Sequence, residues 1–251
     1  MTAAKTIPSL RLRDPRDIYA PAATHAMRVV SQLPDAGALP EDAFWHAPFW
    51  PAYRDPASYD HLVVADDQAG GRPLAMLGAD VLNTGEEEFL IVNAAFVAAP
   101  ARGGRVLRRM LATALLQAAR QGPVPRVIAA RSLDPLFYRS LRLFARGFGV
   151  TLYPEVAAPA LSLRAVALAR RVARCVSPTC RFEPGVFALR GTAAAYGLRR
   201  AVPLATEQDA AIDAMFARQL GDGDQFLLLL DLRGLSAAAI LEAARRIRRQ
   251  R

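Results

Sequence analysis

The sequence has little of several residue types, and each shortage excludes a class of protein. Two cysteines among 251 residues are too few for a disulfide scaffold. The spacing of Cys175 and Cys180 matches no common zinc pattern, and no histidine follows His61 to complete a site. No apolar run approaches the ~20 residues of a membrane-spanning helix, and the N-terminus lacks the apolar core of a secretory signal. We therefore expect a cytoplasmic protein without a metal site.

Lysine is almost absent as well. Lys5 is the only lysine, so nearly all of the positive charge behind the formal net charge of +9 comes from arginine. Abundant arginine and alanine are typical of a GC-rich coding bias that acts on ordinary surface positions. A basic surface favours anionic partners in general. The chain shows no recognition helix, no zinc module and no interleaved aromatic and basic residues on a strand, so specific nucleic-acid binding is not expected.

The hydrophobic pattern predicts a globular α/β or α+β protein. Hydrophobic residues make up 53% of the chain and charged residues 22%. Apolar periodicity predicts helices at 16–33, 104–121, 134–144, 161–175, 206–220 and 236–249, and strands at 61–65, 73–82, 87–98, 126–131, 150–153 and 225–232. The turn at 83–85 should join two antiparallel strands. This order predicts a sheet with helices packed on it. We expect one domain at 1–155, followed at 156–251 by a helix-rich extension or a small second α/β subdomain.

A glycine pair separates a predicted strand from the long helix that follows, in VAAPARGGRVLRRMLATALL. The first-turn N–H groups of a helix lack partners, and the helix dipole adds positive charge there. Glycine lets a phosphate approach these groups closely. Four arginines add full charges around the same place: Arg102, Arg105, Arg108 and Arg109. The loop at 100–106 is therefore a candidate anion-binding site.

This stretch resembles the pyrophosphate-binding motif of the GNAT acyltransferase superfamily, where a strand runs into Arg/Gln-Gly-x-Gly-Ile/Val-Gly/Ala and a long helix. The corresponding residues are Phe96 and Val97, then Arg102, Gly103, Gly104, Arg105, Val106 and Leu107. Arg105 and Leu107 depart from the pattern, which has small residues there. The segment RSLDPLFYRSLRLFARGFG is similar to the next strand and helix of that superfamily, where Asn/Asp-Pro precedes a tyrosine, here Tyr138.

The resemblance implies a mixed, largely antiparallel sheet and direct transfer of an acyl group to an amine. The donor would be acetyl-CoA or a longer acyl-CoA, and the acceptor a small molecule or a peptide. The pantetheine arm would pair with the strand at 87–97 where it splays from the strand at 126–131. An N–H near Phe96 or Val97 would stabilise the oxyanion. Tyr138 would protonate the leaving thiolate, or it is simply a half-buried aromatic of its helix.

The sequence defines the general base less well. Glu88, the last of three glutamates at the start of a strand, and Asn93, which is polar within an apolar strand, are candidates for catalytic roles at the cleft. A solvated acidic turn is the more ordinary role for these glutamates. His46 and His61 are further candidates, although a histidine beside aromatic residues is commonly just packed. The aromatic segment 44–59 either walls an acceptor pocket or closes the edge of the sheet.

Four further hypotheses stay open at this point. A GNAT domain without catalysis could bind a thioester or a protein partner, which the substitutions at Arg105 and Leu107 favour. The donor could be an acyl carrier protein, whose acidic surface would suit a basic enzyme. The basic helix at 161–175 could make peripheral contact with an anionic membrane. Residues 156–251 could complete the acceptor site or form the interface of a homodimer.

Overall fold

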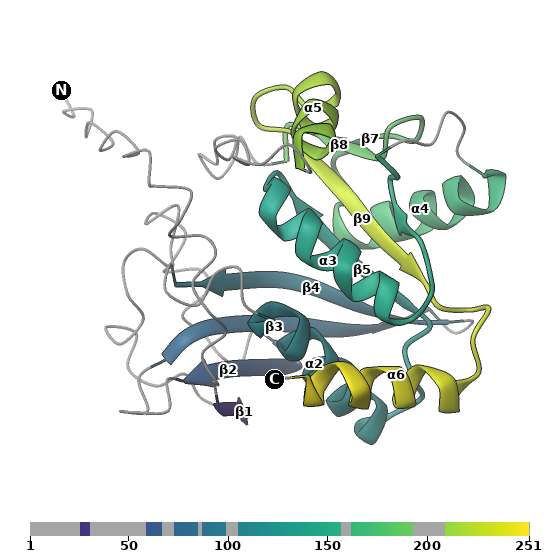
Figure 1. Ribbon diagram of the computed structural model, residues 1–251. Helices are drawn as coiled ribbons and strands as arrows, with labels where there is room; N and C mark the ends of the chain where they lie inside the picture. Colours follow the sequence, from purple (N-terminus) through teal and green to yellow (C-terminus); the bar gives the residue numbers. More distant parts are fainter. Residues whose placement is uncertain are drawn as a thin grey trace, which may run out of the picture.

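The computed structural model describes residues 26–30, 59–66, 73–84, 87–98, 105–156, 162–192 and 209–250, with the backbone alone for 26–30 and for Pro73 (Figure 1). Its strands are β1 (Ala26–Val30), β2 (His61–Asp66), β3 (Pro73–Asn83), β4 (Glu88–Val97), β5 (Val127–Ser132), β6 (Leu152–Tyr153), β7 (Arg181–Glu183), β8 (Ala188–Arg190) and β9 (Gln225–Asp231). Its helices are α2 (Val106–Gln121), α3 (Pro135–Gly147), α4 (Leu163–Val176), α5 (Ala210–Gln219) and α6 (Ala237–Arg249).

All of these strands join one mixed sheet. The order across it is β1-β2-β3-β4-β5-β9-β8-β7, and β6 pairs with β9 beside this path. Among the described strands, β4 and β5 are the one parallel pair, and every other pair is antiparallel. The predicted class, an α/β protein with a largely antiparallel sheet flanked by helices, is confirmed.

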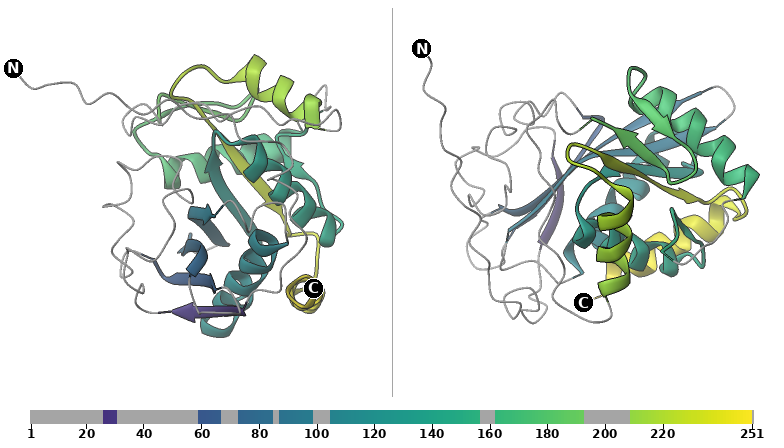
Figure 2. Two further views of the ribbon diagram at one scale, coloured as in Figure 1. Left: turned by 60° about the vertical axis from the view of Figure 1, so that its left-hand side comes forward. Right: turned by 90° about the horizontal axis from the view of Figure 1, so that it is seen from above.

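Helices cover both faces of the sheet. The larger core cluster joins α2, α3, α5 and α6 to one face, and the smaller cluster joins α4 to the other. Figures 1 and 2 show α3 and α4 on opposite sides of the strands. Seven of the ten buried residues of α2 recur at the helical spacing predicted from the sequence: Val106, Leu107, Met110, Leu111, Ala114, Leu115 and Ala118. Ala112, Thr113 and Leu116 are buried as well.

The local signals in the sequence predicted most elements within a few residues. β3 and β4 pair antiparallel across the predicted turn. The cap predicted for α3 is present, because the side chain of Asp134 accepts a hydrogen bond from the backbone N–H of Leu136 at 2.8 Å. Pro135 occupies the first turn of α3, where its missing N–H has no cost.

The helix predicted at 16–33 is wrong for residues 26–30, which form β1 and pair antiparallel with β2. The apolar residues of this short stretch match helical and extended spacing equally, and the adjacent Val29 and Val30 are β-branched residues that favour a strand. Pairing with β2 then decides the conformation. The short hairpin formed by β7 and β8 was not predicted from the sequence either.

Residues 156–251 contribute to the same sheet as the rest of the chain. β9 lies between β5 and β8 and also pairs with β6, so the boundary predicted near residue 155 separates strands that hydrogen-bond to each other. α6 packs beside α2, where the Nε of Arg109 donates to the carbonyl of Arg248 at 3.2 Å. None of the helices within the described ranges is long and apolar enough to span a bilayer.

Candidate functional site

The parallel neighbours β4 and β5 pair over a short distance and then part. Their register runs from Phe89 opposite Val127 to Val92 opposite Ala130. β4 continues for five more residues to Val97. The last four of them pair with β3 alone within the sheet, whereas Arg131 pairs with β9. Two adjacent parallel strands therefore diverge in the middle of the sheet, and the stretch of β4 predicted to meet the thioester lies beyond that point.

A β-bulge marks the place where the strands part. Ala79 on β3 faces Val92 and Gly78 faces Ala94, so Asn93 is an extra residue in β4. Bulges re-aim side chains and are frequent next to active sites. Val92 belongs to the core beneath α2, while Asn93 hydrogen-bonds to Asp80 on the opposite face of the sheet. The structure thus places the predicted site residue Asn93 at the divergence.

Asp80 on β3 is a site residue that the sequence analysis missed. Its Oδ2 accepts from the Nδ2 of Asn93 at 2.5 Å, and its Oδ1 accepts from the backbone N–H of Asp60 at 2.9 Å. Burial raises the pKa of Asp80 above its ordinary value, and the negative charge of Asp60 adds to this, although the hydrogen bonds oppose it. The signal in the sequence was a charged residue inside the apolar strand LGADVL, on the same face as Asn93.

His61, an alternative candidate for the base, lies on the strand next to that of Asp80 and is buried. It opens β2 opposite Ala79, and only 2% of its surface is exposed. Its Nδ1 has no hydrogen-bond partner among the described residues. Burial lowers the pKa of His61 below its usual value, more than the charges of Asp60 and Asp80 raise it. Burial therefore favours the neutral form of this imidazole. His46 and most of the segment 44–59 lie outside the described residues.

The N-terminus of α2 is basic and has no side-chain cap. Arg105 stands at the cap position without a capping hydrogen bond, and the first turn of the helix contains no acidic residue. Burial lowers the pKa of Arg108, and the charge of Arg105 lowers it further. Leu107 is 8% exposed and packs into the core between α2 and the sheet, as does Val106. The predicted anion-binding residues Arg102, Gly103 and Gly104 lie outside the described residues.

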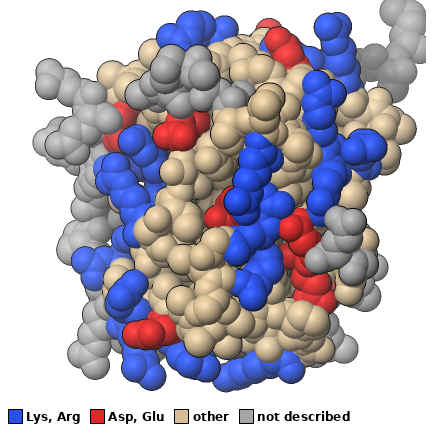
Figure 3. Space-filling model, turned by 90° about the vertical axis from the view of Figure 1, so that its right-hand side faces the viewer, with Lys and Arg blue, Asp and Glu red and all other residues tan. Residues whose placement is uncertain are grey.

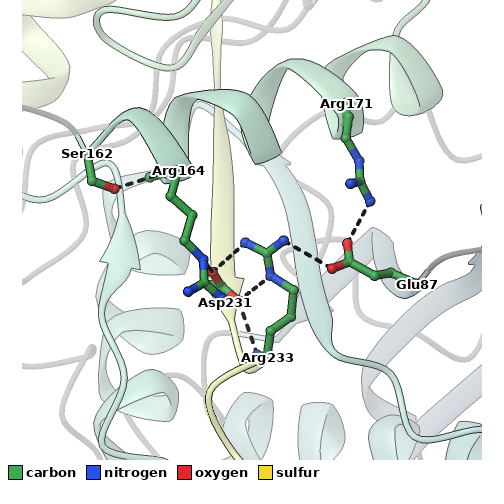
Figure 4. A network of polar contacts seen from close by, with 7 residues as sticks. Glu87, Ser162, Arg164, Arg171, Asp231 and Arg233 are labelled. Atoms are coloured by element: carbon green, nitrogen blue, oxygen red, sulfur yellow. Dashed lines mark hydrogen bonds and ion pairs between the residues drawn. The ribbon is translucent and has the colours of Figure 1, made fainter.

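The glutamates at the start of β4 lie away from the divergence. Glu88 comes five residues before Asn93, about 16 Å along an extended strand, and its Oε1 accepts from the Nδ2 of Asn83 at 3.4 Å. Glu87 takes part in an ion-pair network with Arg171 of α4 at 2.6 Å and with Arg233 at 3.0 Å (Figure 4). Glu87 thus has a structural role, and Glu88 is not brought together with Asn93.

Tyr138 on α3 is buried in the core. Only 1% of its surface is exposed, its ring meets Phe216 edge to face, and its hydroxyl donates to the carbonyl of Pro154 at 2.7 Å. Burial raises the pKa of Tyr138 to about 12. The ordinary pKa of a thiol is about 8.5, well below that of this phenol, so proton transfer from Tyr138 to a thiolate is unfavourable. The role of Tyr138 as the acid stays a prediction, and the geometry favours a role in packing.

The variant Tyr138→Phe is expected to lower the free energy of unfolding by about 1–3 kcal/mol, because the buried carbonyl of Pro154 loses its donor. Denaturant unfolding measures this loss. Tyr153→Phe is the matched control: Tyr153 stacks on Phe187, its hydroxyl has no described hydrogen bond, and we expect a change within about 0.5 kcal/mol. A stable Tyr138→Phe protein whose turnover falls by about 10²–10⁴ would instead assign the tyrosine to acid catalysis.

The described part of the chain contains no group of three or more His, Cys, Asp and Glu side chains that could hold a metal ion. Cys175, at the end of α4, is exposed, and Cys180 is partly buried. The described side chains at the divergence of β4 and β5 include the carboxylate of Asp80 and the amide of Asn93.

Comparison with protein-family models found no match, and neither did comparison with curated proteins. Among solved structures, diaminobutyrate acetyltransferase EctA from Paenibacillus lautus, in complex with L-2,4-diaminobutyric acid and coenzyme A, is 19% identical, with a TM-score of 0.32 over 51% of this chain and 80% of that one. A protein from Thermus thermophilus is 20% identical, with a TM-score of 0.36 over 54% of this chain and 97% of that one.

A malonyl-CoA decarboxylase from Cupriavidus metallidurans is also similar, at 14% identity and a TM-score of 0.36, over 89% of this chain and 64% of that one. TM-scores this low carry no functional conclusion. Function has to be argued from the residues of the site.

Proposed function

We propose that the protein is an N-acyltransferase that moves an acyl group from acyl-CoA directly to an amine. One observation carries the proposal: the parallel strands β4 and β5 stop pairing after Val92 and Ala130, at the bulge formed by Asn93. An extended ligand with amide groups can hydrogen-bond to a strand in the manner of an added strand. The pantetheine arm of CoA is such a ligand, and the divergence offers it a position in the middle of the sheet.

The donor would lie with its diphosphate near the N-terminus of α2 and its thioester near the end of β4. The uncapped first turn and the arginines at 105, 108 and 109 make this end of the helix positive. Phe96 and Val97 remain the predicted contacts of the thioester. In the reaction, the lone pair of the amine attacks the carbonyl carbon, the C–N bond forms, and the C–S bond breaks. The thiolate leaves and takes up a proton.

Charge on the surface suggests a second kind of donor to include in the test. The face in Figure 3 carries more basic than acidic side chains, and the acidic ones lie beside basic ones rather than in a patch of their own. Complementary charge speeds the association of two proteins and helps to fix their orientation. An acyl chain delivered on an acidic carrier protein would therefore reach such a surface readily.

A thermal-shift series tests the proposal, with CoA, acetyl-CoA, longer acyl-CoAs and an acylated carrier protein as separate ligands. At 100 times its dissociation constant a true donor should stabilise the protein by about 2.7 kcal/mol. The release of free thiol is then followed with a panel of primary amines. No stabilisation by any donor would contradict the proposal. Stabilisation without thiol release for any amine would favour a domain that binds a thioester without catalysis.

A further inference from the structure

Two carboxylates on the sheet face opposite α2 lack a cationic partner. Asp80 is partly buried, and its hydrogen bonds come from an amide and a backbone N–H. The neighbouring Asp60 accepts from the backbone N–H of Val81 at 2.8 Å. Neither carboxylate forms an ion pair with any residue that the structure describes. Asp60 is exposed, whereas Asp80 is partly buried. A buried carboxylate is normally paired, so the charge of Asp80 is available to a cation.

One arginine on the same face lacks an anionic partner. Arg131 on β5 is partly buried, and its Nη1 donates to the neutral hydroxyl of Ser177, just after α4, at 3.3 Å. Within the described residues no carboxylate is paired with it. The partly buried guanidiniums of Arg190 and Arg233, in contrast, each contact two carboxylates. The charge of Arg131 is thus available to an anion.

The register of the sheet places these groups around the divergence of β4 and β5. Asp80 pairs with Ile91, and Ile91 pairs with Ala129. Arg131 follows Ala129 by two residues, so its side chain lies on the same face. Asn93 lies between the two on β4. β3 and β5 are two strand spacings apart, about 10 Å. The hydrogen bonds of Asp80 and Arg131 go to other groups, and the two side chains form no ion pair with each other.

A ligand that carries both a cation and an anion would neutralise the carboxylate of Asp80 and the guanidinium of Arg131 together. Building on the proposed acyltransferase function, we propose that this face binds the acceptor, a primary amine that also carries an anionic group, with its ammonium at Asp80 and its anion at Arg131. Asp80 is then a catalytic residue, since it touches the reacting nitrogen, and Arg131 is a binding residue. Asn93 holds the carboxylate of Asp80 in place.

The proton balance of the transfer follows from this arrangement. The carboxylate of Asp80 takes one proton from the ammonium and frees the lone pair that attacks the thioester. When the C–S bond breaks, the amide nitrogen loses a second proton and the thiolate gains one. Asp80 then releases its proton to water. The site therefore requires a carboxylate at residue 80 for turnover, and it requires the cation at residue 131 only for acceptors that carry an anion.

The test compares matched amines in the full-length protein with acetyl-CoA as donor, or with the acyl-CoA that gives the largest thermal shift. Glycine, β-alanine and O-phosphoethanolamine carry an anion, whereas glycinamide and ethanolamine do not. We expect Arg131→Met to raise KM for the first group by about 10-fold or more and to leave KM for the second group unchanged. Arg174→Met, an exposed arginine on α4, is the control and should change neither. Comparison of KM for glycine and β-alanine with KM for O-phosphoethanolamine shows whether the site prefers a carboxylate or a phosphate.

The second arm tests the other end of the site. Asp80→Asn should lower kcat by about 10²–10⁴ for every amine, and thermal unfolding shows whether the variant is folded. Calorimetry measures the binding of the amines in the absence of any donor. It therefore tests the acceptor site independently of acyl transfer. Zwitterion binding that Arg131→Met weakens would support the acceptor site even if no acyl transfer occurs. If the enzyme transfers acyl groups preferentially to ethanolamine, and Arg131→Met does not change KM for any amine, the proposed acceptor site is wrong. The proposed transferase function would still hold.

Discussion

The variant Phe226→Ala is expected to lower the free energy of unfolding by about 3–5 kcal/mol. Phe226 is fully buried on β9, pairs with Ser132 of β5 and Ala188 of β8, and meets the ring of Phe216 at 4.7 Å. Removing its ring takes away buried apolar surface and leaves a cavity between the sheet and α5. β9 also pairs with Arg131 of β5, beyond the point where β4 and β5 part. Loss of the Phe226 ring therefore weakens the packing of the strand that supports Arg131, the proposed anion-binding residue.

Urea or guanidinium unfolding followed by circular dichroism measures this change. Leu163→Ala is the matched control, because Leu163 is 88% exposed at the start of α4, and a surface truncation changes stability by about 0.5 kcal/mol or less. Similar losses in both variants would mean that the interior around β9 is not packed as described.

The variant Arg233→Met should cost about 2–3 kcal/mol of stability. Arg233, just after β9, donates hydrogen bonds to both oxygens of Asp231 at 2.8 and 2.7 Å and contacts Glu87, just before β4, at 3.0 Å (Figure 4). Its side chain is 18% exposed. Glu87 also bonds Arg171 of α4, so one network ties together β4, β9 and α4. Removal of the central guanidinium leaves two carboxylates with weaker compensation.

The same variant should change how stability depends on pH. Burial alone would raise the pKa of Asp231, but the hydrogen bonds from Arg233 outweigh it and hold this pKa below its ordinary value. A lowered carboxyl pKa contributes stability above the unfolded value, about pH 4, and that contribution is lost as the pH falls through the folded pKa. The wild-type protein should therefore lose stability more steeply below about pH 4 than Arg233→Met does.

Arg174→Met is the control for this comparison, because Arg174 is an exposed arginine of α4 whose Nε donates to the carbonyl of Arg170 at 3.3 Å. We expect it to stay within about 0.5 kcal/mol of the wild type at all pH values. If Arg174→Met loses as much stability as Arg233→Met, the overall surface charge determines stability and the ion-pair network around Arg233 does not.

The success of the element predictions has a local cause. The apolar spacing of α2, the cap at Asp134 with Pro135 behind it, and the turn between β3 and β4 each depend on residues close in sequence. Such local signals can be recognised in the sequence without knowledge of the tertiary structure. The helix wrongly predicted over β1 shows the limit, since five residues with an ambiguous pattern took their conformation from a neighbouring strand.

The candidate site was only partly readable. Asn93 was singled out as a polar residue in an apolar strand, and it does lie at the divergence. Glu88, chosen for its position near the start of the same strand, lies at the far end of it. Asp80 and Arg131 come from two other strands, and their relation to Asn93 depends on the register of β3, β4 and β5. No pattern along the sequence contains that register.

The sequence by itself determined the apolar faces of the helices, the alternation of sheet and helix, and the basic start of the long middle helix, because these are properties of neighbouring residues. Tertiary structure alone decided that β9 enters the sheet beside β5, that β4 bulges at Asn93, and that Tyr138 points its hydroxyl at a carbonyl in the core. The physical reason is the sequence separation over which each interaction acts. Propensity and capping act within a few residues, whereas strand pairing and burial join residues that lie tens of positions apart.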